Sequence, residues 1–284
     1  MDGRGRPRPS SPTVVSTIRE ITSSRELFIN LTLRELRGKY KRSVLGWGWS
    51  LLNPLSMMLI YTLIFSLIFK QKIAPGDPSG LDLFPFFLLC GLLPWTYLAN
   101  SMANGMEALV GNANLIKKVY FPREVVVCST VASWLVSFLI EMSVLSISVL
   151  IARNMVLPWL PLVIFFIALE TVYATGIALL LSVCNVYFRD VRHLIGILLQ
   201  LWFYLTPIIY PISFVPVNSH GIPTRFIFLL NPMARFTRVF RNLIYDLRWP
   251  QLTDTLYLTG VAFASLAIGL WVFKRLEGRL GEEL

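Results

Sequence analysis

Six long apolar runs alternate with polar segments along the chain and predict six membrane-crossing helices. The hydrocarbon core of a bilayer takes about 20 apolar residues per helix, so each run is long enough to cross it. The fourth run is too long for one straight helix, and Pro158 and Pro161 near its beginning leave its start open. The predicted spans are Leu51–Phe69, Leu83–Ala103, Val125–Ala152, Val156–Phe188, Leu194–Val217 and Leu256–Phe273.

The residues before the first span follow a helical period of their own. Apolar and polar positions recur every three or four residues from Arg25 to Arg42, which predicts a basic amphipathic helix in the headgroup region of the cytoplasmic leaflet. A charged flank that only satisfies the positive-inside rule is the alternative. The apolar stripe consists of Ile29, Leu33, Leu36 and Tyr40, and the polar stripe beside it of Asn30, Arg34, Arg37 and Lys41.

The segment before the last span is too hydrophobic for a plain loop. Phe226–Leu230 is apolar, Asn231–Pro232 interrupts it, and a second short helix is predicted to follow. Non-helical backbone at membrane depth needs protein or water around it, so we expect a re-entrant helical hairpin near 225–247 in the outer leaflet. An amphipathic helix on the outer surface is the alternative. One face of the second helix carries Phe236, Phe240 and Leu243, and the other Arg235, Arg238 and Arg241.

Composition and charge agree with a membrane protein. The chain has 284 residues, of which 55% are hydrophobic and 15% charged, whereas soluble domains carry about 25% charged residues. Its net charge of +10 follows from the positive-inside rule and from anionic headgroups, and indicates no nucleic-acid partner. Lys and Arg favour the segments on the N-terminal side of the membrane, which places both termini in the cytoplasm. Cys90, Cys128 and Cys184 are isolated and are expected to serve packing only.

The predicted organisation has three parts. Residues 1–24 are rich in Arg, Pro and Ser and are expected to be a disordered tail without a cleaved signal peptide. Residues 25–50 contain the interfacial helix and the approach to the first span. Residues 51–284 form an all-α six-span domain, with a short cytoplasmic helix near 111–124 and the outer hairpin described above.

The chain lacks the motifs of several enzyme classes. Its only Gly-Lys pair, Gly38-Lys39, has neither the upstream glycine nor the following Ser or Thr of a P-loop, so ATP must be hydrolysed by another chain. His193 and His220 form no metal-ligand cluster, and hydrolase motifs are absent. Glu141 and Glu170 lie within predicted spans, where carboxylates are functional candidates. Because no Lys, Arg or His matches their depth, hydrogen bonding to Ser, Tyr or Trp is favoured over a proton relay.

Four sequence motifs resemble those of a known family. The run LRGKYKRSVLGWGWSLLNP from Leu36 to Pro54 is similar to the segment that leads into the first span of ABC-2 type permeases. The match is to the branch that exports lipid-linked polysaccharides such as O-antigen, teichoic acid and galactan. Residues 112–124 (NANLIKKVYFPRE) and 185–191 (NVYFRDV) resemble that family's coupling helix and second cytoplasmic loop, and 231–233 (NPM) resembles its outer gate.

The resemblance implies a half-transporter in the bacterial cytoplasmic membrane. It implies a homodimer that binds two copies of a separate ATPase subunit, and ATP and Mg²⁺ would be held by that subunit. This chain itself would bind no cofactor. The implied substrate is a polyprenyl-pyrophosphate-linked glycan. An ordinary basic inner loop, in place of a coupling helix, is the alternative for 112–120.

Four groups of residues are the predicted functional positions. The ATPase contact is assigned to Asn114, Leu115, Lys117, Lys118, Tyr120, Phe121 and Arg123. The lipid pyrophosphate is assigned to Arg34, Arg37, Lys41 and Arg42. Aromatic rings that can stack on sugars in a channel are Tyr61, Trp95, Trp202, Tyr204 and Tyr210, although such rings also gather at membrane interfaces. The outer gate is assigned to Asn231, Pro232, Arg235, Arg238 and Arg241.

Other functions stay open at this point. An ABC-2 permease for a drug or small lipid would share the same motifs. A proton-coupled secondary transporter would use Glu141 and Glu170, but such folds commonly show inverted repeats, which the sequence lacks. A membrane enzyme that modifies glycans would need acids, His or metal ligands together on one face, and that arrangement is missing.

Overall fold

The computed structural model describes residues 25–39, 45–49, 75–119, 121–218 and 224–279, with a few positions between 52 and 64. These residues form helices and connecting loops, and no strand occurs among them. The predicted tail at 1–24 and almost all of the predicted first span, Leu51–Phe69, lie outside the described residues. So do Tyr40, Lys41, Arg42, Tyr61 and Tyr120.

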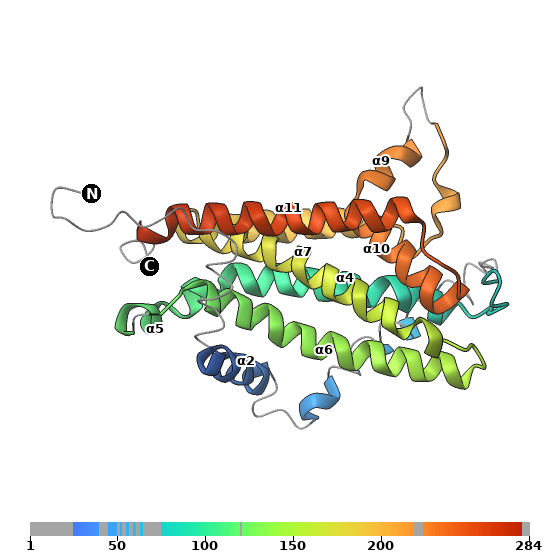
Figure 1. Cartoon of the computed structure of the whole chain (residues 1–284), viewed down its shortest axis with the longest axis horizontal. Coiled ribbons are helices and arrows are strands. Elements are labelled where there is room, and N and C mark those ends of the chain that lie inside the picture. Colours follow the sequence, from blue (N-terminus) through green and yellow to red (C-terminus); the bar gives the residue numbers. More distant parts are fainter. Residues whose placement is uncertain are drawn as a thin grey trace.

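Four long apolar helices run side by side and form the body of the molecule (Figure 1). Each has 25 to 28 residues, and a rise of about 1.5 Å per residue makes them long enough for a hydrocarbon core of about 30 Å. They are the four candidate membrane spans among the described residues. The helices are α4 (Phe84–Gly111), α6 (Glu124–Ile151), α7 (Leu160–Tyr187) and α11 (Leu252–Leu276).

These helices confirm the second, third, fourth and sixth apolar runs as long helices. The sequence left open where the helix of the fourth run begins, and the structure shows that it begins at its prolines. Pro158 lies in a short 3-10 turn, η3 (Leu157–Trp159), and Pro161 occupies the first turn of α7. Proline fits there because the first N–H groups of a helix have no partner within the helix.

The fifth run was predicted to form one helix from Leu194 to Val217, and the structure shows a shorter one. Helix α8 (Val191–Tyr204) has 14 residues, which corresponds to roughly 21 Å and is too short to cross a bilayer alone. Pro207 explains the early end, because it disfavours helical backbone at Thr206 and lacks an N–H group. Thr206 and Ile208 are nevertheless fully buried, so non-helical backbone enters the core at this point.

Two short helices precede the last span, as the hairpin prediction requires. They are α9 (Thr224–Leu230) and α10 (Pro232–Phe240), separated at Asn231, and α10 continues into a π-helical turn, η5 (Arg241–Asp246). In Figure 1, α9 stands away from the four long helices, whereas α10 lies against them. The break at Asn231–Pro232 is therefore confirmed.

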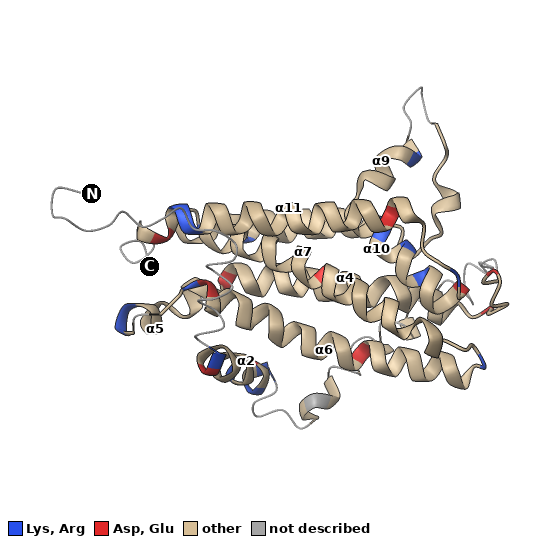
Figure 2. Ribbon diagram, viewed as in Figure 1, with Lys and Arg blue, Asp and Glu red and all other residues tan. Residues whose placement is uncertain are grey.

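The remaining helices gather at one end of the bundle. Helix α2 (Arg25–Lys39) lies against α6, and α5 (Ala113–Lys118) projects beyond the long helices near the C-terminal end of α11 (Figure 1). We call this the α5 end and the opposite one the α10 end. Lys and Arg lie near the two ends, and the long helices between them carry few charges (Figure 2).

The amphipathic pattern of α2 agrees only in part with its packing. Leu36 of the predicted apolar stripe is buried against the protein, and so is Leu31, which the stripe did not include. Ile29 and Leu33 are each 41% exposed. The helix therefore packs on α6 along one line and presents apolar side chains away from the protein along another.

Candidate functional site

At the α5 end, the chain reverses direction between α4 and α6. Helix α4 ends at Gly111, and the side-chain amide of Asn112 donates to the carbonyl of Ala108 (2.8 Å), which satisfies one of the last free carbonyls of the helix. Ile116 of α5 is buried, whereas Lys117 and Lys118 are exposed. The short helix therefore holds on to the bundle by an apolar side chain and presents its cations outward.

A groove of about 770 Å³ lies between α5 and the end of α11. One wall is formed by α5 and the turn that follows it, and the other by the last residues of α11 and the 3-10 turn η6 (Glu277–Arg279). The groove is lined by Ile116, Lys117, Lys118, Val119, Phe121, Pro122, Arg123, Lys274, Glu277 and Gly278.

The cations around this groove have two different environments. Lys274 pairs with the fully buried carboxylate of Glu124 (2.6 Å) and with Glu277 (3.4 Å). The guanidinium of Arg123, a residue assigned to the ATPase contact, donates to the backbone carbonyl of Glu277. Lys117 has no ion pair or hydrogen bond among the described residues, and the same holds for Lys118. These two lysines are the charges that the groove offers to a partner.

The predicted apolar contacts of the coupling segment are partly used within the chain. Leu115 and Phe121 are half-buried and pack against the protein's own core, while Asn114 is exposed. Phe121 also lines the groove. Their contact with an ATPase subunit stays a prediction.

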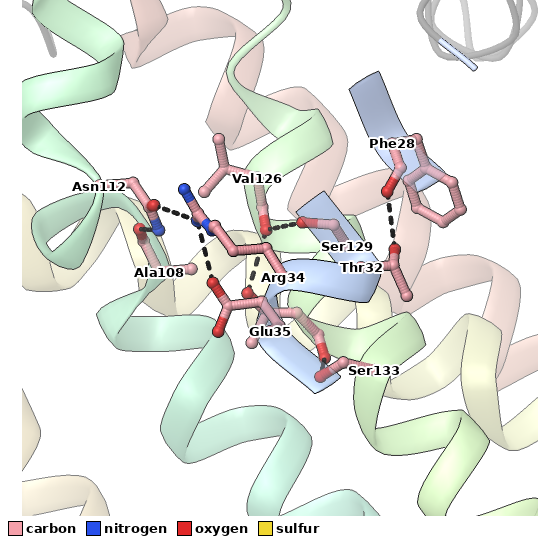
Figure 3. Close-up of polar contacts among 10 residues, drawn as sticks. Phe28, Thr32, Arg34, Glu35, Ala108, Asn112, Val126, Ser129 and Ser133 are labelled. Atoms are coloured by element: carbon pink, nitrogen blue, oxygen red, sulfur yellow. Dashed lines mark hydrogen bonds and ion pairs between the residues drawn. The ribbon is translucent and has the colours of Figure 1, made fainter. Parts of the chain in front are cut away.

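Arg34 of α2 reaches the corner between α4 and α5. Its guanidinium donates to the side-chain oxygen of Asn112 and pairs with Glu35 (3.0 Å), as Figure 3 shows. Arg37 is exposed. Arg34 thus ties the interfacial helix to the turn before α5, whereas Arg37 stays available to an anionic group.

Lys39 at the end of α2 changes the interpretation of Glu141. Its ammonium donates to the carbonyl of Ser133 (3.0 Å) and lies 3.4 Å from the centroid of the Trp134 ring. Burial lowers the pKa of Lys39 to about 7, and the negative charges of Glu141 and Glu35 act in the opposite direction. The sequence-based expectation that Glu141 has no cation near its depth is therefore wrong, because α2 folds back along α6.

Glu170 has a different environment. Its side chain is fully buried in α7, and neither carboxyl oxygen has a hydrogen-bond partner among the described residues. The predicted hydrogen bond to Ser, Tyr or Trp is therefore not found in this part of the chain.

The aromatic residues meet where α4 and α8 approach the α10 end. Trp95 is buried and packs edge-on against Trp202, with ring centroids 5.7 Å apart. Tyr204 is 62% exposed, and the Tyr210 hydroxyl donates to its carbonyl (2.7 Å). The structure thus brings Trp95 and Trp202 together, and leaves Tyr204 at the surface.

Asn231 connects this aromatic group to α10. Its side-chain oxygen accepts from the indole N–H of Trp202 (2.8 Å) and from the backbone N–H of Met233 (3.0 Å). Its amide donates to the hydroxyl of Thr206 (3.0 Å). Asn231 is therefore both the N-cap of α10 and the link to the broken end of α8. Pro232 follows in the first turn, where proline is tolerated.

The three arginines of the predicted gate are all engaged within the chain. Asp254 in the first turn of α11 is fully buried and pairs with Arg235 (3.0 Å) and with Arg238. Arg241 was predicted to lie on the polar face opposite Phe240, but it is only 8% exposed.

The broken fifth helix explains why Arg241 is buried. Its guanidinium donates to the carbonyls of Phe87 (3.2 Å), Pro207 (2.7 Å) and Ile208. The break at Pro207 leaves carbonyls without helical partners, and buried backbone of this kind must be satisfied by other donors. Arg241 supplies them. A Cβ on Gly91 would lie 3.2 Å from its terminal nitrogen, so this glycine makes room for the contact.

Sequence reasoning missed three charged residues at the helix ends, Glu124, Lys274 and Asp254. Each flanks a predicted span and was counted only for charge or hydropathy. An available signal was Asp254, an acid two residues before the last predicted span, which follows four arginines between 235 and 248. Partners on different helices are not visible in a sequence pattern.

A bundle of apolar spans with charged ends and a basic groove defines a multi-pass membrane protein. Its class follows from its similarity to known protein families. The family model for the ABC-2 type transporter matches residues 26–245, so the chain belongs to the ABC-2 type transporter family.

Individual relatives narrow the likeness further. The chain is 30% identical over 276 residues to the O-antigen export system permease protein RfbA of Myxococcus xanthus, covering 95% of this chain and 100% of that protein. It is 32% identical to a protein of the same name from Klebsiella pneumoniae, covering 91% and 95% respectively. The polysialic acid transport protein KpsM of Escherichia coli is 25% identical over 87% of this chain and 92% of its own length.

Proposed function

We propose that this chain is the permease subunit of an ABC exporter that moves a polysaccharide across the bacterial cytoplasmic membrane. The observation that carries the proposal is the alignment along 95% of the chain with a permease named for O-antigen export. A second relative is named for the transport of polysialic acid, which is also a polymer of sugars. These two names favour a glycan substrate over a drug or a small lipid. The glycan arrives linked to a polyprenyl pyrophosphate.

ATP hydrolysis takes place on a separate subunit that docks at the α5 end. The groove between α5 and α11, with Lys117 and Lys118 exposed on one wall, supports this contact. Two copies of the ATPase subunit bind a homodimer of this chain and hold ATP and Mg²⁺. The permease transmits their movement and performs no chemistry of its own.

The topology of the proposal has six spans and both termini in the cytoplasm. Helix α2 and the C-terminal end of α11 lie at the same end of the bundle, which requires an even number of crossings (Figure 1). The short α8 reaches the far side together with the segment that follows Pro207. Helices α9 and α10 form the re-entrant hairpin, and the burial of Met233, Phe236 and Phe240 in the core supports the insertion of α10.

The substrate path begins at α2. Arg37 is exposed there, and with Lys41 and Arg42 it attracts the pyrophosphate at the cytoplasmic surface. Arg34 holds the helix in place through Asn112. The exposed ring of Tyr204 offers a stacking surface to sugars further along. A proton-coupled mechanism through Glu141 is less well supported, because Lys39 anchors α2 on α6 at Ser133 and its charge acts on Glu141.

The proposal is tested by purification from the native membrane and by export in cells. A tagged chain, extracted in mild detergent, is expected to bring down a P-loop ATPase subunit in stoichiometric amount and to hydrolyse ATP. A strain that lacks the chain is expected to lose a surface polysaccharide and to accumulate its lipid-linked form inside. A pure chain without ATPase activity in several detergents and after crosslinking, together with normal surface glycan in the deletion strain, would contradict the proposal.

A further inference from the structure

The last span, α11, is held by buried ion pairs near both of its ends. At the α5 end Lys274 pairs with Glu124 (2.6 Å), and at the α10 end Asp254 pairs with Arg235 (3.0 Å) and with Arg238. The carboxylate of each pair is fully buried. Removing one partner from a buried pair leaves an uncompensated charge, so such pairs resist separation of the helices that they join.

The two pairs join α11 to elements with different tasks. Glu124 is the first residue of α6 and follows directly on the turn that lines the groove, so its pair with Lys274 connects α11 to the groove at the α5 end. Arg235 and Arg238 belong to α10, so their pairs with Asp254 connect α11 to the second helix of the hairpin. The guanidinium of Arg235 also lies 4.1 Å from the ring centroid of Tyr257, which adds a second contact between the same two helices.

Helix α11 is held along its length by α7, because their backbones are nearly in contact. A Cβ on Gly269 would lie 2.1 Å from the carbonyl oxygen of Gly176, and one on Gly176 would lie 2.3 Å from the backbone of Ser265. The hydroxyl of Ser265 donates to the carbonyl of Tyr173 (2.8 Å). Small residues allow this close approach between helices in a membrane.

The α10–η5 segment is also attached to elements other than α11. Arg241, one turn after Arg238, binds the carbonyl of Phe87 in α4 and those of Pro207 and Ile208 in the broken segment after α8. The segment is therefore connected to α11 through Arg235 and Arg238, and to α4 through Arg241. A displacement of α11 relative to α4 would act on α10 through these contacts.

We propose that α11 transmits movement from the groove at the α5 end to α10, with Glu124, Lys274 and Asp254 as the positioning residues at its two ends. The inference rests on the proposed function, because the movement originates in an ATPase subunit docked at the groove. It adds to that function a mechanical connection between nucleotide binding and the hairpin. Coupling between distant sites needs such an element, one whose position both sites influence.

Hydrogen exchange of the purified complex with its ATPase subunit tests this connection. Exchange is measured with and without a non-hydrolysable ATP analogue in the groove segment, 113–118, and in the hairpin segment, 232–246. In the wild-type complex, the analogue is expected to change exchange in both segments. In Asp254→Asn and in Lys274→Met, the nucleotide effect on the hairpin segment is expected to fall by about fivefold or more, the size of typical coupling between sites. The effect on the groove segment should persist.

Two control variants separate the connection from general damage. Asp254→Glu keeps the negative charge between the two arginines and should restore most of the hairpin response. Glu107→Gln removes an exposed ion pair with Arg192 (3.0 Å), which joins α4 to α8 and touches neither end of α11. It should respond like the wild type. If Asp254→Asn does not assemble, Lys274→Met and Arg238→Gln decide the question.

The outcomes distinguish this inference from the proposed function. A hairpin response of wild-type size in both Asp254→Asn and Lys274→Met overturns the connection and leaves the proposed function intact. The absence of an ATPase subunit, or of any nucleotide response in the wild-type complex, overturns the proposed function and the connection together. Loss of the response in both segments would show that the variants disturb docking, which also contradicts the inference.

Discussion

The short helices at the two ends of the bundle, α5 and α10, use their cations in opposite ways. At the α5 end, Lys117 and Lys118 are exposed and have no partner among the described residues. At the α10 end, Arg235 and Arg238 are paired with a buried aspartate, and Arg241 is buried among backbone carbonyls. Both clusters appear alike in the sequence, as basic residues on a short helix. One set is available to another molecule, and the other holds the chain together.

The difference follows from the backbone nearby. At the α5 end, carbonyls at the helix ends accept from Asn112 and Arg123, so Lys117 and Lys118 are not used for this task. The α10 end has a helix broken at Pro207 inside the core, and the freed carbonyls require a strong donor. Arginine suits this task because its planar guanidinium offers five N–H groups and keeps its charge.

The comparison is tested most severely by Arg241→Met. This change leaves the carbonyls of Phe87, Pro207 and Ile208 without their donor, and we expect it to lower the free energy of unfolding by about 3–5 kcal/mol. Denaturant unfolding in detergent measures the loss. Arg248→Met is the matched control, because Arg248 at the same end is half exposed and pairs with Asp246 at 3.2 Å. It should cost at most about 1 kcal/mol. Equal effects of the two variants would remove the distinction.

A smaller loss is expected for Asn231→Ala at the same end. The substitution removes the N-cap of α10 and the acceptor of the Trp202 indole, and we expect a loss of about 2 kcal/mol. Thermal unfolding measures it. Asn231→Asp keeps an acceptor oxygen for Met233 and should recover most of the stability. If Asn231→Ala unfolds like the wild type, Asn231 does not hold α10 to the end of α8.

At the α5 end, reversing charge should leave stability almost unchanged. The double variant Lys117→Glu and Lys118→Glu is expected to alter the free energy of unfolding by less than about 0.5 kcal/mol, because both side chains are exposed. It should weaken binding of the ATPase subunit, most strongly at low salt, because exposed charges steer association. Binding measured between low and high salt checks this. Unchanged affinity at low salt would show that the lysines face solvent only.

A separate prediction concerns pH and Lys39. Burial lowers its pKa from 10.5 in the unfolded chain to about 7, so the unfolded state binds more protons between these values. Stability should therefore rise as the pH increases from about 7 toward 10.5 and gain nothing from this group below about 7. Melting temperatures at pH 6.5 and pH 9 are compared for the wild type and for Lys39→Met. The slope that belongs to Lys39 should vanish in the variant, and an identical slope would contradict the assignment.

Much of the architecture follows from the sequence alone. The hydrophobic runs predict the helices α4, α6, α7 and α11, because a long apolar helix in a membrane satisfies all its backbone groups within the helix. Such a helix can therefore be predicted from its own residues, without knowledge of its neighbours. The break at Asn231–Pro232 and the short helix α5 were also predicted, since proline and an Asn cap act on their immediate neighbours.

The tertiary structure alone decided which charged residues are exposed. The burial of Arg241 depends on α8 ending early and on α4 approaching at Gly91, and the pairing of Glu124 with Lys274 joins residues 150 positions apart in the chain. Lys39 reaches α6 only because α2 folds back on it. Hydropathy and periodicity describe one helix at a time, whereas the state of a charge depends on which other helices lie within a few ångströms of it.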